Sequence, residues 1–402
     1  MVEYYSMARL AKKIYLDYAS TTPVDPRVFK AMLPYFSEKF GNTTSFHEKG
    51  AISSSAVEEA REKIAKTINA KPNEIIFTSS ATESNNFVIK GVAWANKHRG
   101  KHIIISSIEH DCILNSTEWL KTQGFEVTQL PVGKNGLISL ENLKDNIRPD
   151  TILVSIIHGN NEIGTIQDIN AVGKICRKNN IYFHTDAAQS FGKVPINVEK
   201  DNIDLLTASS HKIYGPLGAA LLYKRSGVLV NPLLHGGGHE GTFRSSTVNV
   251  PAIVGFAKAA EICWKDLMKN KKENTKIIKL RDKLIKGILT KIPDTKLNGD
   301  SKKRLPNNAN ITFSFIEGES LLLEFNMAGV YVSTGSACSS RSLKPSHVLM
   351  ALGKNAEDAH GSIRFSLGRW TKEGDIDYVL QVLPGIVKRL RKLSPFTRSS
   401  KL

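Results

Sequence analysis

Residues 204–216, DLLTASSHKIYGP, organise our interpretation of this chain. The segment begins with an apolar, strand-like half, passes through small hydroxyl residues, and ends in a histidine, a lysine and a Gly-Pro stop. A strand that ends in this way brings an amine, an imidazole and two hydroxyls to one point on the edge of a sheet. Lys212 is useful as a nucleophile only if it can lose its proton, which partial burial near other cations favours.

This chemistry suits one cofactor in particular. Pyridoxal phosphate (PLP) uses a Schiff-base lysine and an aspartate on its pyridinium nitrogen, and Ser209 and Ser210 could donate to its phosphate. On this segment alone, a surface lysine that follows a strand is an equally good interpretation.

Short apolar runs recur along the chain, and helical patterns separate several of them. The runs are residues 74–78, 102–106, 125–130, 151–158, 181–186, 204–209 and 218–223. Strands that alternate with helices predict an α/β fold, with a mostly parallel sheet covered by helices on both faces. Ligands gather at the carboxyl ends of such strands. The residues there are Thr82, His110, 158–161, 186–189 and 209–212.

Helical patterns and a change of composition predict two domains. Residues 53–69 carry an apolar helical stripe that Ser53 or Ser54 would cap, and residues 79–85 start another helix whose N-terminus suits a phosphate. From Pro251 the chain turns to long basic helices up to about Ile292, a turn-rich patch over 297–310, and an α+β pattern. We expect a large domain over 20–262, a small domain over 1–19 and 263–393, and a basic tail over 394–402.

Composition limits the class of protein. The 402 residues are 41% hydrophobic, and no apolar run approaches the roughly 20 residues of a membrane span. The first 20 residues lack the apolar core of a signal peptide, so we expect a cytoplasmic protein with no membrane association. Four dispersed cysteines do not form a disulfide scaffold. Cys112, Cys176 and Cys263 lie in apolar patterns typical of buried free thiols.

The net charge of +17 invites a nucleic-acid interpretation. The excess is dilute, however, and its densest part, residues 265–304, is helix-patterned and contains acidic residues. It lacks interleaved aromatic residues and zinc-finger spacing, so a solvated basic helix face explains it and nucleic-acid binding is not the expected function.

Several further residues have both a chemical and a structural interpretation. Asp186 could hold a pyridinium proton or cap a helix, and Gln189 could reach a ring oxygen or act as a second cap. His110 could stack on a flat ring or be an ordinary polar residue, and Asn160 could bind a ligand or form a turn with Asn161.

Two loops raise separate questions. The HGGGH loop at 235–239 offers two histidines but no third ligand, so we expect a flexible loop and no metal site. Cys338 lies among small residues near Arg341, which favours a reactive thiolate over an incidental thiol.

Taken together, the motifs resemble those of the cysteine desulfurases of the NifS and IscS type, PLP enzymes of the class V aminotransferase superfamily. They are YLDYASTTPVDPRV, FGNTTSFHEKG, FTSSATESNN, EHDCIL, HGNNEIGTIQDI, HTDAAQSFGK, SSHKIYGPLGAALLY, HGGGHEGTFRSST, STGSACSS and SIRFSLGR. The resemblance runs from about Tyr15 to Leu393. It implies the PLP-dependent transferase fold of the aspartate aminotransferase type, in a homodimer.

The resemblance also implies roles for individual residues. Lys212 would form the Schiff base and His110 would stack on the ring. Arg364 would bind the substrate carboxylate, with Asn160 nearby, and Cys338 would accept the sulfur as a persulfide. The remaining cofactor contacts that the resemblance implies are Ala81, Thr82, Ser209 and His211 at the phosphate, Asn160, Asp186 and Gln189 at the ring, and Thr247 at the phosphate of the other subunit.

The implied reaction removes sulfur from L-cysteine and releases L-alanine. The sulfur would pass to a recipient such as an iron–sulfur scaffold or a tRNA-thiolation enzyme. No resident metal is implied, although Cys338, through its persulfide, could transiently bind an iron–sulfur cluster. The alternative enzymes on this scaffold are a selenocysteine lyase or another class V PLP enzyme, and an acceptor thiol at Cys338 argues against an aminotransferase.

Overall fold

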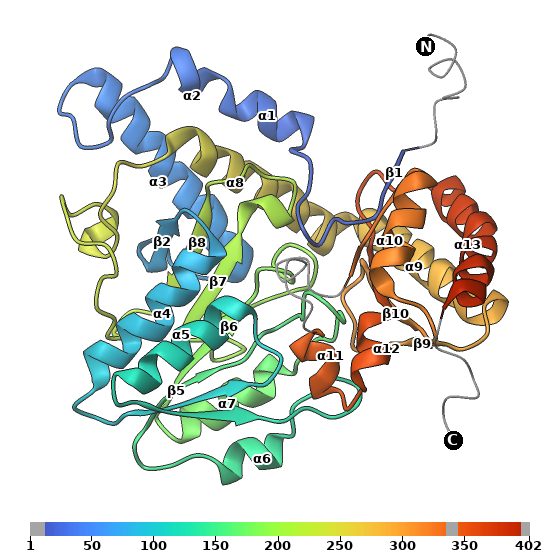
Figure 1. The fold of residues 1–402 in the computed structure, drawn as a ribbon. Helices are drawn as coiled ribbons and strands as arrows, with labels where there is room; N and C mark the ends of the chain where they lie inside the picture. The colour runs from blue at the N-terminus through green and yellow to red at the C-terminus, as the bar shows by residue number, and fades with distance from the viewer. Residues whose placement is uncertain (1–12, 335–344, 395–402) are drawn as a thin grey trace.

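The computed structural model describes residues 13–334 and 345–394. The chain forms a larger part around one sheet and a smaller part around another, joined by the long helix α8 and by the segment that follows β1 (Figure 1). No helix in the described ranges is long and apolar enough to cross a membrane.

The larger part contains, in the described residues, a seven-stranded sheet. Its strands, in spatial order, are β2 (Ile75–Thr78), β8 (Ala220–Lys224), β7 (Leu205–Ser209), β6 (Tyr182–Asp186), β5 (Thr151–Ser155), β3 (His102–Ser106) and β4 (Glu126–Leu130). β8 is antiparallel to both of its neighbours, and the other six strands all point in the same direction. The carboxyl ends of these six strands therefore lie at one edge of the sheet. The predicted mostly parallel sheet is confirmed.

Helices cover both faces of this sheet, because successive strand residues point to opposite sides. Ile104 packs in a core with α3 (Glu48–Ile68), α7 (Ile169–Lys178) and α8 (Val250–Lys265), whereas Ile103 and Ile105 pack with α4 (Ala81–Asn96) and α5 (Asp111–Thr122). The other helical segments of this part are α1 (Pro26–Met32), α2 (Pro34–Ser37), η2 (Pro72–Glu74), α6 (Leu140–Asp145), η3 (Ser210–Lys212), η4 (Glu240–Thr242) and the π-helical turn η5 (Asp266–Asn270).

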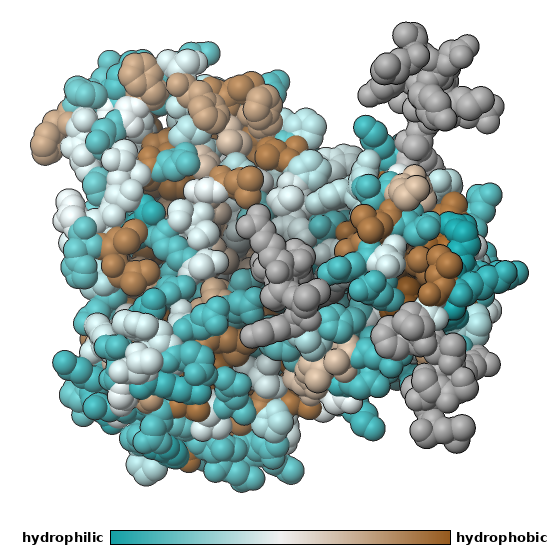
Figure 2. All heavy atoms as spheres, in the orientation of Figure 1, coloured by the Kyte–Doolittle hydropathy of each residue, from teal (hydrophilic) through white to brown (hydrophobic). Residues whose placement is uncertain are grey.

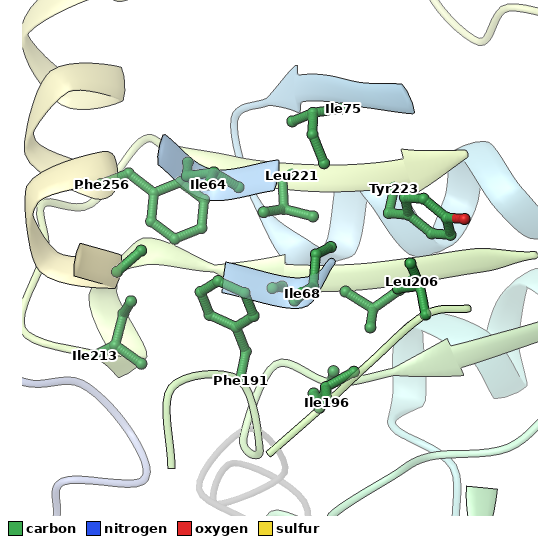
Figure 3. Close-up of a cluster of buried hydrophobic side chains, with 14 of the residues drawn as sticks. Ile64, Ile68, Ile75, Phe191, Ile196, Leu206, Ile213, Leu221, Tyr223 and Phe256 are labelled. Atoms are coloured by element: carbon green, nitrogen blue, oxygen red, sulfur yellow. The ribbon is translucent and has the colours of Figure 1, made fainter. Parts of the chain in front are cut away.

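The first of these cores fixes the two turns that carry the chemistry. Phe191 follows Gln189 and packs on Phe256, with ring centroids 6.0 Å apart, and Ile213 follows Lys212 into the same core (Figure 3). Both side chains are at most 2% exposed. Burying such a side chain stabilises the fold by about 1.5–3 kcal/mol, so each turn is held close to one conformation.

The smaller part has its own core and, in the described residues, a four-stranded sheet of order β12 (Ser333–Thr334), β13 (Ser362–Ser366), β10 (Asn308–Phe313) and β9 (Thr295–Leu297). β1 (Ile14–Tyr15) pairs in parallel with β11 (Val330–Tyr331), which brings the N-terminal segment here. The helices are α9 (Lys272–Lys291), α10 (Gly318–Met327), α11 (His347–Ala351), α12 (Ala356–His360) and α13 (Glu373–Leu393). The domain bounds stay a prediction, and residue 262 lies inside α8.

Three local predictions were wrong. Neither Ser53 nor Ser54 caps a helix, because α3 begins at Glu48 with the His47 imidazole as its cap, and both serines lie inside the helix. The expected turn-rich patch includes the first residues of β10, which starts at Asn308. Cys112 is only partly buried, because it lies on the first turn of α5, beside His110.

Candidate active site

The site forms where the strands of the large sheet end. β2 leads into α4, whose first turn contains Ala81 and Thr82 and whose N-cap is Ser80. β3, β5, β6 and β7 lead to His110, Asn160, Asp186 and Ser209, respectively. The N-terminus of α4 supplies backbone N–H groups and a positive dipole end, which suit a phosphate.

Lys212 lies at the end of η3, directly after β7. Its Nζ donates to the carbonyl oxygens of Ala19 (2.7 Å) and Ser20 (2.6 Å), in the segment between β1 and α1. Gly215 closes the turn and lets it pack closely on Ser210, since a Cβ there would lie 2.1 Å from Ser210 Oγ. The position of the amine is therefore set by both neighbouring segments of the chain.

Asp186 ends the adjacent strand and is 4% exposed. Its Oδ2 accepts from Asn85 Nδ2 (2.7 Å) and its Oδ1 from the Ala188 N–H (2.8 Å). No helix follows, so the capping interpretation of Asp186 does not apply. None of the ion pairs found in residues 13–334 and 345–394 includes this carboxylate. A buried carboxylate of this kind suits a cationic partner such as a protonated pyridine ring.

His110 is the N-cap of α5, and its Nδ1 accepts from the Cys112 N–H at 3.2 Å. The Cys112 thiol lies 3.1 Å from the same nitrogen, and Asn85 Nδ2 lies 3.2 Å from that sulfur. Because Nδ1 accepts, the neutral imidazole carries its proton on Nε2. Asn85 thus connects Asp186 to the His110 side of the site.

Three other predicted residues lie at the same edge. Asn160 is buried, donating to the Ile108 carbonyl (2.9 Å) and accepting from two N–H groups of its own turn. Gln189 Nε2 donates to the Ala19 carbonyl at 2.8 Å. His211 Nδ1 lies 3.1 Å from Thr21 Oγ1, and burial followed by nearby cations lowers the pKa of His211 to about 4.

Arg364 reaches the site from the smaller part, although it lies in the middle of β13. It is 2% exposed, and its Nη2 donates to Asp17 Oδ1 (2.9 Å) and Ser20 Oγ (2.8 Å). Its Nη1 donates to the Asn161 carbonyl at 3.1 Å, while its buried Nε has no partner in the described residues. Arg364 and Lys212 therefore meet at Ser20.

Some buried groups of the site were not predicted from the sequence. Glu109 is fully buried, with Oε1 accepting from Ser106 Oγ (2.5 Å) and the Ile157 N–H (2.8 Å), and burial raises its pKa to about 8. His158, which was among the residues expected at a strand end, is also buried, and burial lowers its pKa to about 4. Glu109 lies inside the motif EHDCIL, so that motif could have pointed to it, and Asp17 and Asn85 also lie inside motifs of the resemblance.

The remaining predicted residues are less defined. Cys338 lies outside the described residues. Thr247 is exposed, beyond the loop that contains His235 and His239. That loop is anchored, since the Glu240 carboxylate accepts from Arg61 (2.8 Å), and no group of potential metal ligands occurs in residues 13–334 and 345–394.

Comparisons with known proteins agree with this arrangement. The family model described as aminotransferase class-V matches residues 14–379. A protein of Methanosarcina thermophila named cysteine desulfurase IscS is 54% identical over 386 residues, which are 96% of this chain and 95% of that protein.

Two solved structures are also similar. One titled NifS-like protein has a TM-score of 0.88 at 38% identity and covers 94% of this chain and 100% of its own. Another, titled SspA in complex with cysteine, has a TM-score of 0.78 at 37% identity and covers 90% and 100%, respectively. The chain belongs to the class V aminotransferase family and, within it, to the cysteine desulfurases of the NifS and IscS type.

Proposed function

We propose that this protein is a PLP-dependent cysteine desulfurase, which removes sulfur from L-cysteine, releases L-alanine and holds the sulfur as a persulfide on Cys338. One observation carries the proposal. The Lys212 amine and the Arg364 guanidinium, from two separate cores, meet at Ser20, beside the strand that ends in Asp186. An amine, a carboxylate and a carboxylate-binding cation are what chemistry at the α-carbon of an amino acid requires.

The residues present fit the cofactor. The N-terminus of α4 with Ala81 and Thr82, together with Ser209 and His211, would bind its phosphate. Asp186 would bind the pyridine nitrogen, with His110, Asn160 and Gln189 around the ring. When bound to Lys212, PLP supplies an electron sink for the bonds at the substrate α-carbon.

The protein side chains would perform the remaining steps. The carbonyl oxygens of Ala19 and Ser20 accept hydrogen bonds from the Lys212 amine. These two bonds orient the nitrogen lone pair that would take the α-proton of the substrate. The Nε and Nη groups of Arg364 could form two parallel hydrogen bonds to the substrate carboxylate. The substrate would then compete with the Asp17 carboxylate for the guanidinium. His110 Nε2 would pass a proton to or from the substrate thiol.

Residues on either side of the segment that contains Cys338 are fixed beside the site. Ser333 pairs with Arg364 in the small sheet, and the Ser346 hydroxyl donates to Glu162 at 2.5 Å, in the turn after Asn160. This anchoring, with the acceptor motif of the family, supports Cys338 as the group that attacks the substrate sulfur.

The test is a paired assay of sulfide and alanine formed from L-cysteine by the holoenzyme. We expect Lys212→Ala to lose the bound PLP colour and both products. Cys338→Ser should keep the colour but lose persulfide formation. Sulfide output by Cys338→Ser equal to wild type, without added thiol, would refute the persulfide step. Turnover of L-selenocysteine with none of L-cysteine would favour the alternative, a selenocysteine lyase.

We also infer a homodimer in the cytoplasm that passes sulfur to an acceptor such as an iron–sulfur scaffold or a tRNA-thiolation enzyme. Exposed apolar side chains gather over α1 and α2 (Figure 2), including Phe29 and Phe36, which are 52% and 62% exposed. A patch of this kind commonly marks a protein interface. Thr247, exposed in one chain, would reach the phosphate in the other. Light scattering that gives a monomer mass would contradict the dimer.

A further inference from the structure

Lys193 ends the HTDAAQSFGK motif, and the proposed reaction gives it no task. It belongs to the compact turn after β6, in which its N–H donates to the Ser190 carbonyl at 2.9 Å. Gly192 in this turn has φ +71°, and a Cβ there would lie 3.1 Å from Ile213 Cγ2. The turn is thus packed directly against the residue that follows Lys212.

A chain of hydrogen bonds connects the two lysines. Lys193 Nζ donates to Gln189 Oε1 (3.3 Å), and Gln189 Nε2 donates to the Ala19 carbonyl (2.8 Å). The same carbonyl accepts from Lys212 Nζ at 2.7 Å. An ammonium can only donate and a carbonyl can only accept, so these two groups allow only one orientation of the Gln189 amide.

The charges around Lys193 are mostly positive on the side of the active site. No ion pair in the described residues includes it, although Asp266 and Glu273 line the small cavity behind it. The titratable and charged groups that face it are Lys212, His211 and Tyr214 from η3 and the adjacent turn, Arg364 from β13, Cys263 from α8, Asp266 from η5 and Glu273 from α9. Burial and then Lys212 lower the pKa of Lys193 to about 7.

We propose that Lys193 is a positioning residue of the active site, which orients the Gln189 amide and, by its charge, favours the neutral form of the amine at Lys212. Two neighbouring cations each disfavour protonation of the other, so as long as Lys193 is protonated its charge lowers the pH at which Lys212 can act as a base. This inference rests on the proposed function, because it assigns Lys193 to the same site.

The test replaces Lys193 with Met, which keeps the length of the side chain and removes its charge and donors. In the holoenzyme we expect the midpoint of the pH dependence of the visible absorbance of the bound coenzyme to rise by about 0.5–1 on the pH scale. At a pH below both midpoints, kcat should fall by up to about tenfold if the midpoint rises by about 1, with little change in KM. Lys193→Arg should bring both the midpoint and kcat most of the way back to the wild-type values. Lys178→Met, at the exposed end of α7, should change neither the midpoint nor kcat.

A second measurement needs neither coenzyme nor turnover. The pH dependence of Lys212 acetylation by a limiting amount of acetic anhydride, read by mass spectrometry, should show the same upward shift in Lys193→Met. A variant that only lost packing would unfold at a lower temperature with both midpoints unchanged, and that result would overturn the inference. Lys193→Gln serves if the Met variant does not fold. A wild type that binds no PLP would sink the proposed function, while the acetylation still decides the role of Lys193.

Discussion

The two parts of the molecule supply the site in different ways. In the larger part, the functional groups come from strand ends and from the turns that follow them. Core residues such as Phe191 and Ile213 hold these turns in place, and the backbone of each turn then positions the functional side chain. In the smaller part, Arg364 comes from the middle of a strand, where it pairs with Asp17, and its long side chain must cross to Ser20 and Asn161 in the larger part.

The difference teaches where the site is most sensitive. A turn held by a core tolerates the loss of one hydrogen bond, because the core still positions the backbone. A guanidinium that crosses between two cores depends on every partner, since breaking one buried charge pair leaves the other charge uncompensated. Apart from the side chains that carry the chemistry, substitutions that break contacts between the parts should therefore cost more function than substitutions within either part.

The strongest test of this comparison is Arg364. We expect Arg364→Leu to lower kcat/KM for L-cysteine by about 150- to 5000-fold, because a buried substrate carboxylate without its charged partner costs about 3–5 kcal/mol. Steady-state kinetics of sulfide release would measure it. Arg364→Lys should recover only part of the lost kcat/KM, since the lysine ammonium cannot form two parallel hydrogen bonds to a carboxylate.

Two controls separate binding from folding in this test. Arg389→Leu, which breaks the exposed pair with Glu324 on the surface of the smaller part, should leave kcat/KM unchanged. Arg364→Leu with Asp17→Asn should regain stability but not activity. Equal kinetics of Arg364→Leu and wild type would mean that the crossing side chain does not bind substrate.

Within the larger part, Glu109 should have a pH-dependent effect on stability. Its folded-state pKa is raised to about 8 by burial, so between its ordinary value and 8 the folded protein holds a proton that the unfolded chain has lost. The contribution of Glu109 to the free energy of unfolding is therefore fully present at low pH and is lost as pH rises through that window. The loss is up to about 1.4 kcal/mol per pH unit.

Glu109→Gln should remove this slope, because the amide oxygen can still accept from Ser106 and Ile157. Urea unfolding at pH 5, 6.5 and 8 would show the variant gaining stability relative to wild type as pH rises. The exposed Glu141→Gln, in the first turn of α6, is the matched control. Parallel curves for Glu109→Gln and wild type would show that Glu109 is ionised in the folded protein.

The same comparison explains what the sequence could predict. Short apolar runs separated by helical patterns locate strands, and the polar residues that end them share an edge. The gathering of Lys212, Asp186, His110 and Asn160 at one edge therefore followed from pattern, whereas their roles came from the family resemblance. Arg364 does not end a strand, and only the family resemblance pointed to it. Contacts made by side chains that cross between segments, such as Asn85 on Asp186, leave no periodic signal.

The smallest expected effect concerns two neighbouring helix caps of the smaller part. Ser346 caps α11 by accepting from the Leu349 N–H (3.2 Å), and it also donates to Glu162 in the larger part (2.5 Å). Asn355 caps α12 by accepting from the Asp358 N–H (2.7 Å) and is exposed. Loss of a cap alone costs about 1 kcal/mol, which is the result we expect for Asn355→Ala by thermal or urea unfolding.

Ser346→Ala should cost about 1–2 kcal/mol more than Asn355→Ala, because it also leaves a buried carboxyl oxygen without its donor. Since Glu162 belongs to the turn that carries Asn160 and Asn161, Ser346→Ala should in addition raise KM for L-cysteine, and Asn355→Ala should not. Equal losses of stability with unchanged KM for both variants would show that contacts between the two parts matter no more than those within one, and would reverse the comparison.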